Sequence, residues 1–480
     1  MVRNWLVASA IALTTAGCEG GFNFNEQMPG NGDRGVSLSA GDIAIDPAGR
    51  YYLARAGDRT VHVGIEDGDA RVLSRLGTPM QMAFSPSGDQ IFMVSDTGEG
   101  TALIGYDVAS DTRLFSEPVT WEWRWEWEDE RRDAGFSAVQ VTPDGGHVIV
   151  NSEDRLWVIA TDDGRTIATR QFAQTIADVD VLADSRHLLV TLMESWDDEA
   201  VTTRVVKLAI GAEAGLEASF TMDIPNCASE LVVDQAERFA YLAPTECLTP
   251  ETRRGKDPVS LLDLQSGEFV RNLPGFGPVG MAADGEVIVA FMDMQQLDRS
   301  LFLEGDTIPE PGSRYRLMFI DAATLSFDTI ELGGELPRYA ITPDGEVVLV
   351  DSDALFAYDE ARIRVVDVAS RAMRPVAGPL VQLDHYAFTA DARTAYVVDR
   401  GLFRMDVAEA RIDSVPIDFT PKNLNLTPDD RHLILRHSDD ALMTFDVESG
   451  QLRHRVAFEE LGRDVEIHVD VELDVRLELR

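Results

Sequence analysis

A four-residue turn recurs along most of this chain and constrains its fold more than any other feature. In its fullest form the turn is Thr/Ser-Pro-Asp/Ser-Gly, as at Thr142-Pro143-Asp144-Gly145. Proline presets φ at the first central position, aspartate caps the turn with its side chain, and glycine tolerates a left-handed φ. The motif therefore predicts a tight connection between two strands wherever it occurs.

Versions of this turn occur nine times, each between two short apolar strands. They begin at Asp46, Ser85, Thr142, Leu182, Asp234, Ala282, Thr342, Thr389 and Thr427. A third strand such as Ile363–Asp367 follows, and a more polar fourth stretch such as Glu268–Leu273 closes the unit. Apolar and polar residues alternate in these stretches, and no segment sustains the 3.6-residue period of a helix, so the pattern indicates an all-β chain.

Repeated four-stranded units of this size are typical of a β-propeller, in which antiparallel blades stand radially around an axis. We count nine units and allow seven to nine blades, because a degenerate unit around Ala283, or the first unit, is easily miscounted. From residue 36 to about 460 the repeat resembles the YVTN/lactonase-like propellers, which are WD-repeat-like in shape. That resemblance implies the fold and is too general to imply an activity.

The N-terminus predicts export and a lipid anchor. Arg3 precedes an apolar run over residues 5–15 that is too short to span a bilayer. The run ends in Thr15-Ala16-Gly17-Cys18, which resembles the bacterial lipobox, whose cysteine accepts diacylglycerol. We therefore expect a lipoprotein signal peptide at 1–17, lipidation of Cys18 and a flexible tether at 18–35. The alternative is an ordinary secretory signal that leaves Cys18 free.

Residues 36–480 are predicted to be the propeller, with a C-terminal β extension from about residue 461. Residues 465–479 alternate between aliphatic and mostly charged residues without a break, which is far longer than an ordinary strand. We expect this tail to bend or project, and to close the ring by pairing near residues 36–45. Pairing beside the tryptophan-rich segment described below, or with another protein, is the alternative.

Export also bears on the two other cysteines, Cys227 and Cys247. They flank the open end of a hairpin predicted from Glu230–Val233 and Arg238–Ala243. An oxidising compartment favours a disulfide between them. A zinc site is less favoured because no histidine lies between the two cysteines. We expect no metal and no other cofactor.

The charge balance restricts the partners. The chain has 83 Asp and Glu against 42 Lys and Arg, for a formal net charge of −41. So negative a surface repels nucleic acid and anionic lipid headgroups. We therefore expect an envelope protein or glycan as partner, no nucleic acid, and membrane contact through the lipid anchor alone. The predicted location is the cell envelope, either the outer membrane facing the periplasm or the cell surface.

Polar residues recur four positions before the turns, where the inner strands of a propeller begin at the mouth of the channel. The candidate binding residues there are Asp42, Gln81, Asp178, Glu230, Arg338, His385 and Asn423. Loops after the second strands add carboxylates, including Asp293, Asp351 and Asp399. Convergent polar groups at such a mouth form the usual ligand site of the fold. The alternative is purely structural, because tight turns favour aspartate and the chain is acidic throughout.

Two further sets of residues stand out. Trp121, Trp123, Trp125 and Trp127 alternate with charged residues, which places four tryptophans on one face of a strand. They form either an aromatic platform for a sugar, peptide or protein, or the packed face of an outer strand. His147, His187 and His432 share one repeat position just after the turn, and we interpret them as structural residues.

Two functions fit this sequence. The first is a non-catalytic envelope lipoprotein whose propeller binds a protein or glycan partner. The second is a periplasmic lactonase-like or other hydrolase at the channel mouth, with His385 as general base beside Glu230, Arg338 and Asp384. The sequence has no G-x-S-x-G, H-E-x-x-H or C-x-x-C-H motif, so no catalytic residue is assigned and the scaffold is favoured.

Overall fold

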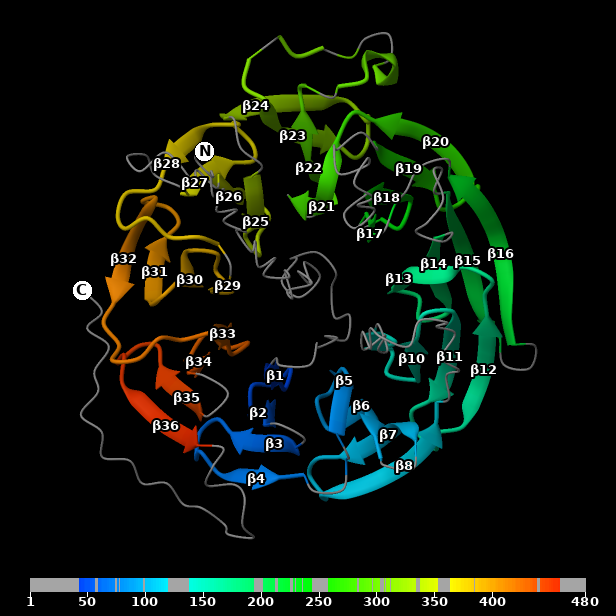
Figure 1. The fold of residues 1–480 in the computed structure, drawn as a ribbon, viewed down its shortest axis with the longest axis vertical. Coiled ribbons are helices and arrows are strands. Elements are labelled where there is room, and N and C mark those ends of the chain that lie inside the picture. Colours follow the sequence, from blue (N-terminus) through cyan, green and yellow to red (C-terminus); the bar gives the residue numbers. More distant parts are fainter. Residues whose placement is uncertain are drawn as a thin grey trace, which may run out of the picture.

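The protein is a nine-bladed β-propeller, in which nine four-stranded antiparallel sheets stand around a central axis (Figure 1). The computed structural model describes residues 43–56, 59–73, 76, 78–97, 100–119, 138–193, 202–211, 215–224, 228, 230–234, 236–243, 258–282, 285–295, 297–302, 306, 308–310, 312–333, 337–352, 363–383, 385–437 and 441–457. Each sheet is built from four consecutive strands. The predicted fold class is confirmed, and all nine sequence units are blades.

The blades are numbered in chain order, and the first strand of each is the innermost. Blade 1 contains β1 (Ile43–Ile45), β2 (Tyr51–Ala56), β3 (Arg59–Gly64) and β4 (Ala70–Val72). Blade 2 contains β5 (Thr78–Phe84), β6 (Gln90–Asp96), β7 (Thr101–Asp107) and β8 (Thr112–Pro118). Blade 3 contains β9 (Ala138–Val141), β10 (His147–Asn151), β11 (Arg155–Ala160) and β12 (Thr166–Gln171).

Blade 4 has the two longest strands of the described structure, its third and fourth. Blade 4 contains β13 (Thr175–Val181), β14 (His187–Met193), β15 (Thr203–Gly211) and β16 (Gly215–Ile224). Blade 5 contains β17 (Glu230–Val233), β18 (Phe239–Ala243), β19 (Val259–Asp263) and β20 (Glu268–Leu273). Blade 6 contains β21 (Phe276–Ala282), β22 (Val287–Asp293), the 3-10 helix η3 (Arg299–Leu301), β23 (Tyr315–Asp321) and β24 (Phe327–Gly333).

The last three blades complete the ring. Blade 7 contains β25 (Pro337–Ile341), β26 (Val347–Ser352), β27 (Ile363–Asp367) and β28 (Met373–Pro375). Blade 8 contains β29 (His385–Phe388), β30 (Thr394–Val398), β31 (Leu402–Asp406) and β32 (Arg411–Val415). Blade 9 contains β33 (Asn423–Leu426), β34 (His432–Arg436), β35 (Ala441–Asp446) and β36 (Leu452–Ala457).

Both faces of every sheet are packed against a neighbouring blade. In β22, Ile288 and Ala290 point toward blade 5, whereas Val289 and Phe291 point toward blade 7. Successive side chains of a strand point to opposite faces, so an apolar residue at every position covers both junctions. The same arrangement gives one apolar cluster at each of the nine junctions.

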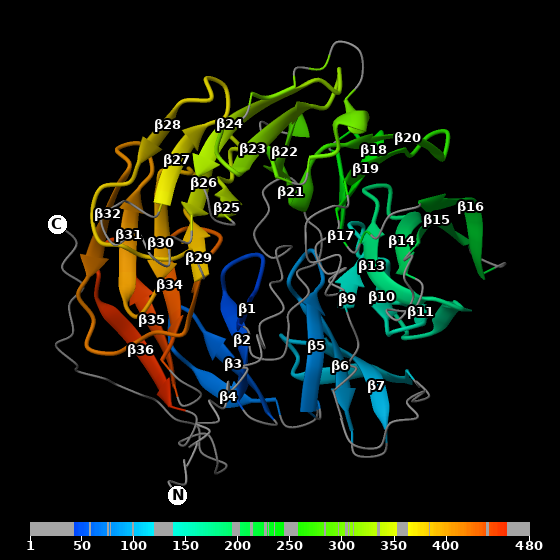
Figure 2. The same ribbon diagram turned by 45° about the horizontal axis from the view of Figure 1, so that its top comes forward.

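The ring closes where blade 9 meets blade 1, and β36 lies beside β3 and β4 in Figures 1 and 2. Blade 9 contributes Ile434, Leu442 and Val456, which pack against Tyr52 and Val63 among other residues of blade 1. Within the described residues this closure uses side-chain packing and exchanges no strand. The tail that we predicted to close the ring lies outside the described residues, so that hypothesis stays a prediction.

The repeated turn has the hydrogen bonds that its sequence predicts. Thr142 Oγ1 donates to Asp144 Oδ1 at 2.7 Å and accepts the His147 N–H at 3.0 Å. The Gly145 N–H donates to the Thr142 carbonyl at 2.7 Å, and Gly145 has a left-handed φ of 72°. All nine turns have a left-handed residue at this fourth position: Gly49, Gly88, Gly145, Ser185, Glu237, Gly285, Gly345, Ala392 and Asp430.

Neighbouring turns also contact one another around the ring. At two of the turns that have alanine in place of proline at the second position, the alanine N–H donates to the acidic side chain at the fourth position of the next turn. The Ala183 N–H donates to Glu237 at 2.5 Å, and the Ala390 N–H donates to Asp430 at 2.8 Å. The turns therefore join blades as well as strands.

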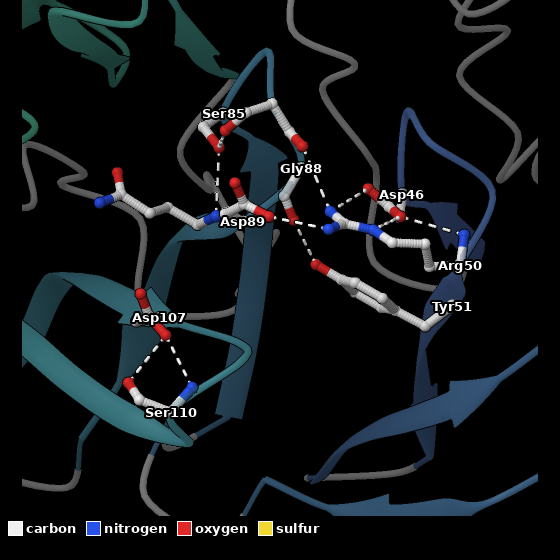
Figure 3. A network of polar contacts seen from close by, with 10 residues as sticks. Asp46, Arg50, Tyr51, Ser85, Gly88, Asp89, Asp107 and Ser110 are labelled. Atoms are coloured by element: carbon white, nitrogen blue, oxygen red, sulfur yellow. Dashed lines mark hydrogen bonds and ion pairs between the residues drawn. The ribbon is translucent and has the colours of Figure 1, made fainter.

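An arginine forms a polar link at the junction of blades 1 and 2 (Figure 3). Arg50 Nε donates to Asp46 Oδ2 at 2.7 Å, and its Nη1 donates to Asp89 Oδ1 in blade 2 at 2.8 Å. The Tyr51 hydroxyl donates to the Gly88 carbonyl of blade 2. The side chain of Asp46 has 0% exposure, so Arg50 neutralises a buried carboxylate and ties two blades together.

Replacing Arg50 with alanine should lower the free energy of unfolding by about 2–3 kcal/mol, because it leaves the Asp46 carboxylate buried without its cation. Arg411→Ala is the matched control, since Arg411 and Asp413 form an ion pair with 60% and 51% exposure. That variant should lose at most about 1 kcal/mol. Chemical denaturation measures both losses, and equal losses would contradict the role assigned to Arg50.

Candidate functional site

The candidate residues on the inner strands lie at one level of the ring. Each stands at the same rung of its inner ladder, opposite a residue near the end of the second strand. The pairs are Gln81 with Val94, Asp178 with Thr191, Glu230 with Ala243, Arg338 with Asp351, His385 with Val398, and Asn423 with Arg436. Because the inner strands surround the axis, this rung encircles it (Figure 1). The equivalence predicted from the turns is confirmed.

Asp178 links two inner strands rather than standing free at this rung. A bulge in β13 precedes it, its Oδ1 accepts the Val179 N–H at 2.8 Å, and its Oδ2 accepts the Leu231 N–H of blade 5 at 3.1 Å. Gln140 of blade 3 similarly donates to the Val179 carbonyl at 2.7 Å. The inner edge of a blade carries unpaired backbone groups, and these side chains satisfy them.

The other described residues of the rung differ in exposure. Asn423 is half-buried, and its Oδ1 accepts the Leu424 N–H at 2.7 Å. Gln81 is also half-buried and has a polar or electrostatic partner. His385 is exposed at the start of β29. Among the described side chains of this rung, His385 is therefore the one that is exposed.

Two predicted loop carboxylates position the segment that leads to His385. Asp351 Oδ2 accepts the Leu383 N–H at 2.9 Å, and Asp399 Oδ2 accepts the Gln382 N–H at 3.1 Å. Asp351 is 2% exposed, which makes it a structural acceptor for the backbone. The sequence analysis made both carboxylates candidate ligands. In the structure each accepts a backbone N–H of the segment before β29 instead.

Asp293, the third predicted loop carboxylate, is also committed to a partner. Its Oδ2 lies 3.0 Å from Arg314 Nη2, and the Asp293 side chain is only 3% exposed. The ion pair holds the start of the segment that contains η3. Hydrogen bonding to the Asp293 carboxylate also raises the pKa of Arg314, so the guanidinium stays charged.

The residues considered for acid–base chemistry come from different blades. Arg338 and His385 belong to adjacent blades, but Glu230 belongs to blade 5, with blade 6 between it and Arg338. Burial raises the pKa of Tyr386, next to His385, to about 12, so this phenol holds its proton at neutral pH. Among the residues that the structure describes, no group of three or more His, Cys, Asp or Glu could hold a metal ion.

Several predicted site residues lie outside the described part of the chain. They are Cys18, Asp42, Trp121, Trp123, Trp125, Trp127, Cys227, Cys247 and Asp384. The side chains of Glu230 and Arg338 also lie outside it. The hairpin predicted between the two cysteines is present as β17 and β18, with Glu230 opposite Ala243. Within the described ranges, no helix has the length and hydrophobicity needed to cross a membrane.

Comparisons with known proteins find likeness in fold. No protein-family model matches the sequence, and no curated protein matches it. The Kuenenia stuttgartiensis hydrazine synthase is similar in structure, with 16% identity over 64% of this chain and 94% of that one, and a TM-score of 0.36. The dihydro-heme d1 dehydrogenase NirN in complex with DHE has 14% identity over 88% and 75%, and a TM-score of 0.46.

A functionally unknown protein from Desulfotomaculum acetoxidans is a further structural neighbour. Its identity is 14%, over 65% of this chain and 95% of that one, with a TM-score of 0.37. Likenesses this distant concern the fold alone. The chain is a β-propeller protein with structural neighbours among propellers of differing description.

Asp178→Ala should lower the free energy of unfolding by about 1–3 kcal/mol, because the Leu231 N–H loses its acceptor between two blades. Asp178→Asn keeps a side-chain oxygen and should lose less. His385→Ala serves as the control, since an exposed residue of the same rung should change stability by only about 0.5 kcal/mol. Chemical denaturation compares the three variants, and an unaltered Asp178→Ala protein would refute the capping role.

Proposed function

We propose that this protein is a lipid-anchored component of the bacterial cell envelope whose propeller is a non-catalytic scaffold for a protein or glycan partner. The lipobox-like sequence at Thr15-Ala16-Gly17-Cys18 supports the anchor. The YVTN/lactonase-like repeat pattern supports the kind of propeller. The closed ring of packed blades supports a rigid platform.

The observation that carries this proposal is the bonding of the carboxylates near the rung. Asp178, Asp351 and Asp399 each accept a backbone N–H from a neighbouring segment. A general base must be available to a substrate proton, whereas these groups hold the backbone in place. The rung is therefore suited to present a fixed surface on which exposed groups such as His385 contact a partner.

The net charge of −41 limits the partner's chemistry. An anionic partner would be repelled over much of the surface, so the favoured partner is a neutral or basic protein surface, or an uncharged glycan. The four tryptophans at 121–127 belong to this proposal as a second contact surface. Aromatic side chains dominate the binding energy of many interfaces.

A pull-down from envelope extract tests the scaffold function. The chain lacking residues 1–18 should capture a partner from the extract. The Arg338→Ala/His385→Ala double variant should capture at least about ten-fold less of that partner, with an unchanged melting temperature. Ten-fold corresponds to about 1.4 kcal/mol of binding free energy. The competing hydrolase is tested with the same two proteins on lactone and ester substrates. Turnover that the double variant abolishes would replace the scaffold proposal with the enzyme.

The chemical state of the three cysteines tests the proposed location in the cell envelope. Intact-mass and peptide mapping of protein extracted from membranes should show a chain that begins at Cys18 with a diacylglyceryl mass, and a peptide linking Cys227 to Cys247. A bridge requires their Cα atoms to lie within about 7 Å. An unmodified Cys18 would remove the lipid anchor from the proposal, and two free thiols in the oxidised protein would remove the disulfide.

A further inference from the structure

A histidine is buried at the junction that closes the ring. His432 begins β34, and Ile434, which lies on the same face of that strand, packs against blade 1. His432 is 1% exposed, and neither ring nitrogen has a hydrogen-bond partner in the described structure. A neutral imidazole is tolerated there, but a proton would place a charge without a hydrogen-bond acceptor in a closed junction.

Charged groups from both blades surround this imidazole. Arg453 of β36 lies near it and is the cation that disfavours a second positive charge. Arg453 Nη1 is 2.7 Å from Glu66 Oε2 in blade 1, and its Nη2 is 3.3 Å from Asp446 Oδ2. Asp429, in the turn before His432, is the third carboxylate that acts on the ring electrostatically.

Further polar contacts cross the same junction. His454 Nε2 lies 3.1 Å from the Glu66 carbonyl oxygen, and Arg431 Nη1 lies 4.0 Å from the Glu66 carboxylate. Tyr52 and Thr444 place their hydroxyl oxygens 3.4 Å apart. The Glu66 carboxylate at the junction of blades 9 and 1 is thus already paired with Arg453 and lies near Arg431. It has little capacity left to compensate a charge on His432.

Burial, followed by the charge of Arg453, lowers the pKa of His432. A histidine in an open or unfolded segment has a pKa of about 6.5. The open form therefore binds more protons than the closed form below that value. Stability of the closed junction is fully present above about pH 6.5 and is lost as the pH falls toward the lowered pKa of the closed state.

The position of His432 in the repeat does not by itself lower the pKa of a histidine. The equivalent residues that face the next blade are Tyr51, Gln90, His147, His187, Phe239, Val287, Val347 and Thr394. His187 differs from His432 because its side chain is 31% exposed and its Nδ1 lies 2.5 Å from Asp184 Oδ2. A proton on His187 is therefore paired, whereas a proton on His432 is not.

We propose that the junction between blades 9 and 1 is an acid-responsive closure, in which protonation of His432 separates the two terminal blades while the other junctions stay closed. Within the described residues, blades 9 and 1 are the one neighbouring pair that is not consecutive in the sequence, so they can separate while the described linkers between the other blades stay in place. Such local opening exposes the apolar faces of blades 1 and 9.

Hydrogen exchange of the full chain at pH 7.5 and 5.5, corrected for the intrinsic pH dependence, tests the proposal. Exchange of the β34–β36 amides should increase up to about ten-fold at pH 5.5, the limit set by a histidine of pKa about 6.5 in the open state. Strand β3 is left out of the readout because it carries His62. His432→Val, the residue type found at Val347 in blade 7, should abolish that increase.

His187→Val is the matched control, and it should leave the increase at the seam unchanged. His432→Gln, the residue type of Gln90 in blade 2, replaces His432→Val if that variant does not fold at pH 7.5. His62 is half-buried, its Nδ1 has no hydrogen-bond partner among the described residues, and burial lowers its pKa to about 4. It stacks on Tyr51, which packs against blade 2, so its acid response belongs to that junction and is the same in all variants. Retained acid opening in the His432 variants, or equal opening at all junctions, would overturn the proposal.

Discussion

The structure depends on the mutual burial of blade faces. In β6, Ile91 and Met93 are covered by blade 1, whereas Phe92 and Val94 are covered by blade 3. A single blade would leave both of its apolar faces in water, so each sheet is stabilised only as a member of the ring. The two terminal blades depend most on this arrangement, because each has one face that is covered only when the ring closes.

Polar interactions in this protein serve mainly to hold that packing in register. Arg50 neutralises the buried Asp46 and reaches Asp89 across a junction, and the turns bond to one another around the ring. Blades 9 and 1 have the same kind of apolar contact, and three of their side chains, Arg431, Arg453 and His454, contact Glu66. Closure of the ring therefore rests on apolar packing that also encloses the buried His432.

The rung around the axis also uses polar side chains to hold neighbouring blades together. The side chains of Asp178 and Asn423 accept hydrogen bonds from backbone N–H groups at the inner edges of the blades. What remains available is a fixed set of exposed groups in a rigid frame, represented among the described side chains by His385. Such an arrangement is the basis of the proposal that the protein is a scaffold for a partner.

The sequence by itself determined the units of this protein, because turn chemistry acts within a few residues. Ile363–Asp367 and Glu268–Leu273, predicted from alternation, are strands with those same bounds, and the nine turns mark nine blades. Tertiary structure decided the rest. Asp178 bonds to Leu231 in another blade, and His187 and His432 share one repeat position but not one environment. The burial of a side chain and the charges around it depend on the neighbouring blade, which comes from a distant part of the chain. A local sequence pattern does not contain that information.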